Sequence, residues 1–263
     1  MNWTWYGDLG NCTLHWGAWA EGQWQASDRL PADLLGSQQG NDLLLTALQE
    51  AGLKTADCQK AVLCISSPRR RSQAEQFAVN QLETDVAVAG DDFPVEVETD
   101  YHDPTQIGTD RLLNALAAIQ KVGKACVVVD FGSCLTCDAI TRQGVLTAGA
   151  IAAGLPVMLS GLRALVPHLY TSIEDAMNMC GVNALPPGHS TDQGLTLGIV
   201  GGLAGSADRL ISIMRRKVGR RASIVATGGD MHLMMPHCEA RMIADEMLTL
   251  DGLRLAYEAS QYR

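Results

Sequence analysis

Two short stretches of the chain each lead an apolar or aromatic run into an aspartate-glycine turn. The first, WYGDLGNC, contains Asp8 and Gly10, and the second, VVVDFGSC, contains Asp130 and Gly132. Such turns present a carboxylate, and their glycines let backbone N–H groups approach an anion closely. The metal that accompanies ATP also requires a carboxylate beside the phosphates. An isolated turn of this kind is usually structural, but two copies in matched surroundings indicate nucleotide phosphate chemistry.

Other glycines and one further aspartate are also candidates for nucleotide phosphate chemistry. A buried strand, SIVAT, runs straight into Thr227-Gly228-Gly229, and loops at the carboxyl ends of strands are where α/β sheets bind ligands. The series from Gly198 to Gly205 resembles a phosphate loop, but it lies within a helical pattern, so close helix packing is its expected role. Asp110 stands in the first turn of a predicted helix. Such an aspartate is often only a helix cap, yet it is a candidate general base.

The elements that must position these residues repeat in the same order. After each aspartate turn come a second alternating strand, a tight turn and a third strand, with the tight turn at the same distance from the aspartate. Helix and strand patterns then follow each set of three strands. The predicted strands after the turns are 13–20, 23–26, 135–140 and 145–148, with further short strands at 60–65 and 222–226. The predicted helices are 41–53, 70–82, 110–121, 156–165 and 195–215.

This repeated order predicts an α/β protein made of two duplicated domains that face one another across a cleft. We place the first domain at 1–114, with the first phosphate motif, and the second at 115–263. The helix that begins near Asp110 links the two halves and belongs by sequence to either.

Composition narrows the class of protein. The 263 residues are 47% hydrophobic and 19% charged, with a net charge of −9, which argues against a nucleic-acid partner. The N-terminus lacks the features of a signal peptide, and no stretch reaches the roughly 18 apolar residues of a membrane span. Eight cysteines in so long a chain, mostly within apolar strands or helices, indicate reduced thiols and a cytoplasmic location. We therefore expect neither a nucleic-acid nor a membrane partner.

Taken in order, the motifs resemble those of the type III pantothenate kinases, in the superfamily of acetate and sugar kinases, Hsp70 and actin. DLGNC at Asp8–Cys12 matches a D-x-G-N-T motif, and YHDPTQIGTDR at Tyr101–Arg111 matches a central block ending in G-x-D-R. DFGSCLTCD at Asp130–Asp138 and the late T-G-G match the remaining motifs. The chain departs from the family where Cys12 replaces a threonine that would help to hold phosphate.

The resemblance implies two tandem RNase H-like (actin-like) domains and transfer of the γ-phosphoryl of ATP to pantothenate. The product would be 4′-phosphopantothenate, at the first step of coenzyme A synthesis. It implies Asp110 as the catalytic base, Mg²⁺ with ATP held at Asp8 directly or through water, and K⁺ or NH₄⁺ at Asp130. It also implies a homodimer formed by the second domain, where segments 148–164 and 194–207 are candidates. The implied substrate-binding residues are Tyr101, Gly108, Thr109, Arg111 and Thr191. The implied ATP-binding residues are Asp8, Leu9, Gly10, Asn11, Cys12, Thr13, Ser133, Thr227, Gly228 and Gly229.

Two alternatives stay open. One keeps the fold but changes the acceptor to another small hydroxyl or carboxylate compound, and the central block argues against it. The other is a non-catalytic nucleotide-binding accessory or regulatory protein on the same fold. The presence of Asp8, Asp110, Arg111 and Asp130 together favours catalysis.

Overall fold

The computed structural model describes residues 1–169 and 184–262. The chain forms two compact units that are not continuous in sequence. Unit 1 comprises Met1–Val97, Asp103–Ala117 and Met247–Arg263, and unit 2 comprises Glu98–His102 and Ala118–Glu246. The C-terminal helix therefore packs with the N-terminal part of the chain, and no local pattern predicts that position. The division into domains 1–114 and 115–263 stays a prediction.

Unit 1 is built on a five-stranded sheet in the order β3-β2-β1-β4-β5. The first three strands are antiparallel neighbours, while β4 and β5 run parallel to β1. This arrangement confirms the predicted run of three strands followed by a buried one. The strands are β1 (Trp3–Leu9), β2 (Thr13–Ala20), β3 (Gln23–Pro31), β4 (Cys58–Ile65) and β5 (Val86–Val88). β3 is longer than predicted because its polar second half stays paired with β2 as an edge strand.

Helices cover both faces of this sheet. Helices α1 (Gln38–Glu50) and α2 (Arg71–Gln81) pack against the face that carries Trp3 and Trp5. Helices α3 (Thr109–Val122) and α9 (Leu248–Gln261) bury leucines against the opposite face. α9 also packs tightly on α3, because a Cβ at Gly252 would lie 2.1 Å from the Leu113 carbonyl oxygen.

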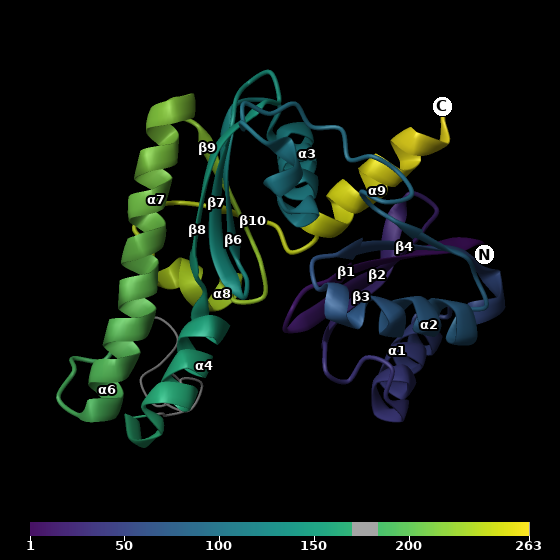
Figure 1. Ribbon diagram of the computed structural model, residues 1–263, viewed down its shortest axis with the longest axis horizontal. Coiled ribbons are helices and arrows are strands. Elements are labelled where there is room, and N and C mark those ends of the chain that lie inside the picture. Colours follow the sequence, from purple (N-terminus) through teal and green to yellow (C-terminus); the bar gives the residue numbers. More distant parts are fainter. Residues whose placement is uncertain (170–183, 263) are drawn as a thin grey trace. The chain divides into compact units, whose positions relative to one another are not determined.

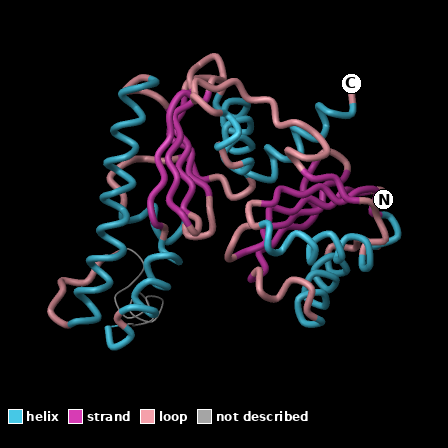
Figure 2. The backbone as a smooth tube through the Cα atoms, viewed as in Figure 1, coloured by secondary structure: helices cyan, strands magenta, loops and turns pink. Residues whose placement is uncertain are grey.

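Unit 2 repeats the sheet of unit 1, in the order β10-β9-β6-β7-β8. β6, β7 and β8 are antiparallel neighbours, and β9 runs parallel to β6 as β4 does to β1. The duplicated order predicted from the sequence is therefore confirmed, with each unit forming one sheet that helices accompany (Figure 2). The strands are β6 (Cys126–Phe131), β7 (Cys134–Ile140), β8 (Leu146–Ala153), β9 (Ser223–Thr227) and β10 (Ile243–Ala244).

The helices of unit 2 complete its hydrophobic core. α4 (Leu155–Leu165) follows β8. A long helical segment runs beside the sheet (Figure 1), and it consists of α6 (Thr191–Thr196), a π-helical turn (Leu197–Gly201) and α7 (Gly202–Val218). The short α8 (Met231–Met234) follows β9. Leu203, Ala207 and Ile211 of α7 pack into the core with the strands.

The segment from Thr191 to Val218 corrects the expectation that no stretch suits a membrane span. Its mean hydropathy reaches 1.3 over 18 residues, so by length and composition alone it is long and apolar enough to cross one. A single helix of this kind is weak support for a membrane span, because helices that pack against soluble cores pass the same test. Here one side of the helix packs into the core of unit 2.

Candidate active site

The first aspartate turn closes tightly between β1 and β2. The Gly10 N–H donates to the Thr13 carbonyl over 2.9 Å, and the Ala32 N–H donates to the Cys12 carbonyl over 2.9 Å. A Cβ at Gly10 would lie 3.3 Å from the Thr13 carbonyl oxygen, so the turn has little room for a side chain there. Asn11 and Cys12 are exposed at the tip. The turn thus presents the small, open surface that a phosphate requires.

Asp8 lies in a row of polar side chains that crosses the sheet of unit 1. It pairs with His15 on β2 and with Cys64 on β4, and His15 pairs in turn with Arg29 on β3. Side chains that lie directly opposite one another on neighbouring strands share a face of the sheet. This is the face on which α3 and α9 pack, since Tyr6 and Cys64 belong to their cluster.

Cys64 is the most buried member of this row, with no exposed surface. Its thiol donates a hydrogen bond to the Asp8 carboxylate and accepts one from the Ser66 hydroxyl. Burial, followed by the negative charges of Asp8 and Asp110, raises the pKa of Cys64 well above its ordinary value. The thiol therefore stays protonated, and it lies near both carboxylates.

Asp110 is held at the beginning of α3 by its own backbone. Its Oδ1 accepts a hydrogen bond from the Arg111 N–H over 2.9 Å. A Cβ at Gly108 would lie only 2.5 Å from that same oxygen, so position 108, two residues earlier, must be glycine for the carboxylate to keep this orientation. Through Cys64, the structure brings together two residues, Asp8 and Asp110, that are about a hundred positions apart in the sequence.

His15 was not among the residues predicted from the sequence. It is 5% exposed, and burial, helped by the positive charge of Arg29, lowers its pKa to about 3. The imidazole is therefore neutral at neutral pH. Cys64 was also missed, because a cysteine in an apolar strand resembles any other core residue. For both, the only signal in the sequence is their position on a strand, and it becomes informative once the strand register is known.

The second aspartate turn, in unit 2, brings Asp130 against the end of β9. Asp130 pairs with Thr227, and a Cβ at Gly228 would lie 2.5 Å from both Asp130 Oδ1 and the Phe131 carbonyl oxygen. Gly228 also has a φ of +98°, which only glycine adopts readily. Asp130, Thr227 and Gly228 were all predicted from the sequence, and the structure places them together.

The end of β8 packs against the same turn. The Gly154 N–H donates to the Ser133 carbonyl over 3.0 Å, and a Cβ at Gly154 would lie 2.1 Å from the Gly132 carbonyl oxygen. Gly154 directly precedes α4, so the second turn lies at the N-terminus of that helix. The N-terminus of a helix favours anions. Unit 2 therefore combines a carboxylate, a glycine pair and a helix N-terminus in one region.

The remaining predicted residues belong to two regions. Thr109 and Arg111 lie with Asp110 in unit 1, where Arg111 is 7% exposed. Tyr101 and Thr191 belong to unit 2, where Tyr101 is half-buried and Thr191 is exposed at the beginning of α6. Among the residues that the structure describes, no group of three or more His, Cys, Asp or Glu side chains is arranged to hold a metal ion.

Fold and sites together define a class of protein. Solved structures with the same two-lobed fold include component A of (R)-2-hydroxyglutaryl-CoA dehydratase from Acidaminococcus fermentans, with a TM-score of 0.58 and 13% identity. That match covers 99% of this chain and 100% of the other. A putative 2-dehydro-3-deoxygalactonokinase from Sinorhizobium meliloti matches with a TM-score of 0.52 and 11% identity, over 98% of this chain and 99% of the other. The chain thus shares the two-domain α/β fold of these proteins, with one mixed five-stranded sheet in each unit.

Sequence comparison gives the family. The profile of the type III pantothenate kinases matches residues 6–213, and this chain belongs to that family. One relative, the type III pantothenate kinase of Moorella thermoacetica, is 29% identical over 256 residues, which is 95% of this chain and 97% of the relative. Membership of this family of ATP-dependent kinases implies ATP with a divalent metal.

Proposed function

We propose that this chain transfers the γ-phosphoryl of ATP to pantothenate and so forms 4′-phosphopantothenate, the first intermediate of coenzyme A synthesis. Family membership supports the substrate pair. The observation that carries the proposal within the structure is that the Asp8 and Asp110 carboxylates both act on the buried Cys64 thiol. One carboxylate beside a phosphate turn and another at a helix N-terminus are the two acidic groups that phosphoryl transfer to an alcohol needs.

Asp110 is the proposed general base. A primary hydroxyl of pantothenate loses its proton as it attacks the γ-phosphorus, and the Asp110 carboxylate accepts that proton. The Arg111 N–H fixes Oδ1, and the N-terminus of α3 favours a negative charge at this position. Gly108, Thr109, Arg111, Tyr101 and Thr191 are proposed to bind pantothenate. The guanidinium of Arg111 suits a carboxylate or carbonyl of that substrate.

ATP is proposed to bind at both aspartate turns. In unit 1, Asp8 takes the Mg²⁺ ion directly or through water, and the segment from Leu9 to Thr13 contacts the phosphates. Oxygen is the ligand that Mg²⁺ prefers, and Asp8 is only half-buried, so the residue present fits the metal. A bound Mg²⁺ would supply positive charge that offsets the charge of the phosphates. In unit 2, Ser133, Thr227, Gly228 and Gly229 are proposed to bind the nucleotide.

Asp130 is proposed to hold a monovalent cation, K⁺ or NH₄⁺. Asp130 Oδ1 and the Phe131 carbonyl oxygen both lie 2.5 Å from the position of a Gly228 Cβ, so a carboxylate and a carbonyl oxygen lie close together. Such an oxygen pair fits a weakly hydrated cation, which would offset part of the charge of the triphosphate. Replacing K⁺ with Na⁺ should then slow the reaction.

A homodimer formed by unit 2 is also proposed. Close packing within the chain was expected for the Gly198–Gly205 series. It holds at Gly201, where a Cβ would lie 3.1 Å from a Leu185 methyl carbon, but a Cβ at Gly198, Gly202 or Gly205 would meet no atom within 4 Å in the described part of the chain. Ile151, Val157 and Leu197 are large apolar side chains that remain 40% or more exposed in the same unit. An open glycine series with exposed apolar neighbours suits contact with a second copy. A cytoplasmic location is proposed from the metabolic role of the family.

The experiment that tests the function measures 4′-phosphopantothenate formation by the purified chain with Mg²⁺·ATP in potassium or sodium buffer. Asp110→Asn should lose turnover by a factor of about 100 or more while still binding Mg²⁺·ADP. Asp42→Asn, an exposed aspartate of α1 in the same unit, is the matched control and should behave as the wild type. Nucleotide binding without product in either salt would contradict kinase activity on pantothenate, and would favour another acceptor or the accessory-protein alternative.

A further inference from the structure

A pocket of about 370 Å³ opens in unit 2 between the second half of α7 and the segment that follows α8. Its lining residues include Asp208, Ser212, Arg215, Arg216, Arg220 and Glu239. No residue predicted for ATP, pantothenate or metal binding lines it. Its volume lies at the lower end of the range of small-molecule sites.

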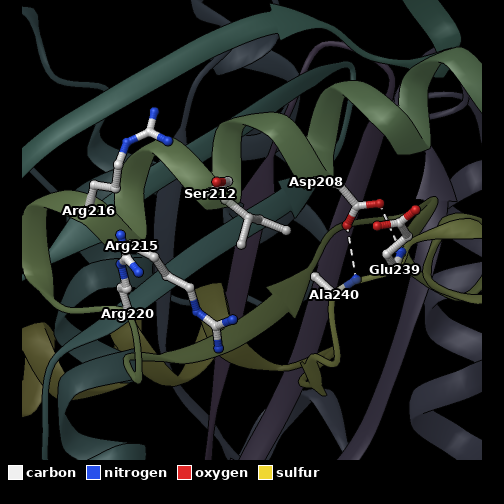
Figure 3. Close-up of a pocket in the computed structure, with 8 residues that line it drawn as sticks. Asp208, Ser212, Arg215, Arg216, Arg220, Glu239 and Ala240 are labelled. Atoms are coloured by element: carbon white, nitrogen blue, oxygen red, sulfur yellow. Dashed lines mark hydrogen bonds between the residues drawn. The ribbon is translucent and has the colours of Figure 1, made fainter.

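Positive and negative side chains lie on opposite sides of the pocket. Arg215, Arg216 and Arg220 gather on one side of it, Asp208 and Glu239 lie on the other, and Ser212 lies between them (Figure 3). In a chain with a net charge of −9, five of the 20 lysine and arginine residues fall between Arg215 and Arg221. This end of α7 is therefore a concentrated positive patch on an acidic protein.

Stabilisation of the helix end does not account for this patch. Basic side chains in the last turn of α7 complement the negative end of the helix dipole. Arg220, however, lies beyond Val218, where α7 ends, and also lines the pocket. The ion pairs found in the described part of the chain include neither Arg216 nor Arg220.

One side chain on each wall of the pocket, Arg215 and Asp208, is held by hydrogen bonds before any ligand binds. The Arg215 Nε and Nη2 atoms donate to the Ala222 carbonyl over 3.1 and 2.8 Å, which leaves Nη1 outside this interaction. On the other wall, the two Asp208 oxygens accept from the N–H groups of Glu239 and Ala240 over 2.8 and 3.0 Å (Figure 3). Asp208 is therefore engaged in holding the backbone, and Glu239 remains as the exposed acid of that wall. Among the three arginines, Arg215 is thus preorganised and loses little entropy on binding, whereas Arg216 and Arg220 are exposed side chains.

We propose that this pocket binds a small phosphate monoester, with the phosphate at the arginine side and the hydroxyl or amide N–H groups of the ligand toward Ser212 and Glu239. Guanidinium groups are the side chains best suited to phosphate oxygens, because they donate several hydrogen bonds in a plane. The carboxylate of Glu239 accepts from donors and disfavours a second anionic group. The ligand class is therefore a singly phosphorylated, hydroxyl-bearing small molecule. This site does not depend on the proposed kinase function.

Isothermal titration calorimetry on the full chain tests the proposal, with Mg²⁺·ADP present so that the proposed nucleotide site is filled. Glycerol 3-phosphate is the probe, inorganic phosphate tests the phosphate alone, and glycerol tests the hydroxyl groups alone. We expect glycerol 3-phosphate to bind more tightly than phosphate, and glycerol not to bind measurably. Arg216→Gln and Arg220→Gln should each raise the dissociation constant by about tenfold, since hydrogen bonds to charged groups are the strong ones.

Arg209→Gln is the matched control, because it removes one positive charge from an exposed arginine of α7 that does not line the pocket. It should leave the dissociation constant within about twofold of the wild type. Binding that is equal in wild type and in the Arg216→Gln/Arg220→Gln double variant would overturn the proposal, as would an absence of binding by the wild type at millimolar probe. Equal weakening by Arg209→Gln would show general electrostatic attraction and would also overturn it.

Discussion

The hydrogen bond from the Cys64 thiol to Asp8 makes a prediction about nucleotide binding. Cys64→Ala removes the donor that orients the Asp8 carboxylate, while Cys64→Ser replaces it with a hydroxyl of similar size. Hydrogen bonds to charged groups contribute about 1.5–3 kcal/mol, and a thiol is a weak donor, so we expect a loss of about 1–1.5 kcal/mol. That corresponds to a roughly five- to tenfold weaker affinity of Cys64→Ala for Mg²⁺·ADP.

Loss of packing must be separated from loss of orientation. Cys126 on β6 is as fully buried as Cys64, and burial alone raises the pKa of its thiol, to about 12, so no carboxylate acts on it. Cys126→Ala should therefore lower the free energy of unfolding by about 1 kcal/mol, as a small buried truncation does, without changing nucleotide affinity. Cys64→Ala should lower both, and Cys64→Ser should restore most of the affinity.

The assay is calorimetric titration with Mg²⁺·ADP under reducing conditions, together with urea unfolding of each variant. In turnover, the change should appear mainly in the KM for ATP rather than in kcat, because Asp110 keeps its hydrogen bond from Arg111. The reasoning is refuted if Cys64→Ala and Cys126→Ala bind Mg²⁺·ADP equally well. It is refuted equally if Cys64→Ser binds as weakly as Cys64→Ala.

Three further predictions concern other parts of the chain. Gly228→Ala should abolish nucleotide binding and lower the melting temperature, because its Cβ would meet Asp130 Oδ1 at 2.5 Å and its φ is +98°; calorimetric binding of Mg²⁺·ADP equal to that of the wild type would contradict this. His15 stays neutral in the folded protein down to about pH 3, but its imidazole protonates near pH 6.5 once the chain unfolds, so the free energy of unfolding should fall as the pH drops from 6.5 toward 3. The part of this decrease due to His15 is about 2 kcal/mol at pH 5. Urea unfolding at pH 7 and pH 5 should therefore show a smaller decrease for His15→Gln than for the wild type. Arg254→Gln should cost about 1 kcal/mol in urea unfolding, because the guanidinium lies 4.2 Å from the Trp19 ring centroid and pairs with Glu258; an unchanged midpoint would contradict this.

Much of each sheet could be predicted because its signals are local. Alternating apolar residues and the glycine turns at Gly22 and Gly144 define three neighbouring strands in each half, and the sheet orders confirm them. Asp8, Asp110 and Asp130 could be proposed as site residues because each follows a recognisable turn or opens a helix.

What could not be predicted depends on contacts between distant segments. Nothing local assigns α9 to unit 1, and its position follows from Gly252 lying against the Leu113 carbonyl. His15 and Cys64 become neighbours of Asp8 only through the register of three strands. A one-residue shift in either pairing would place these side chains on the other face of the sheet. The sequence of a single strand therefore does not show that His15 and Cys64 lie beside Asp8.

The duplicated turns also explain how one structural unit supplies two different binding environments. Cys64 faces Asp8 across β1 and β4, and Thr227 faces Asp130 at the equivalent position across β6 and β9. In unit 1 the chain then continues to Ser66, whose N–H donates to the Leu9 carbonyl over 3.0 Å. In unit 2 it continues through Gly228 and Gly229, and the Asp230 N–H donates to the equivalent Phe131 carbonyl over 2.9 Å.

That difference in the closing segment changes what surrounds each carboxylate. Asp8 receives a thiol hydrogen bond from a fully buried neighbour, which orients the carboxylate, and oriented carboxylates suit the metal role proposed for Asp8. Asp130 instead has a glycine beside it, and the lack of a Cβ lets backbone approach its oxygen within a distance that no other residue allows. We propose that this difference lets two copies of one turn hold two different cations, because the strand that follows each copy supplies a side chain in one case and backbone in the other.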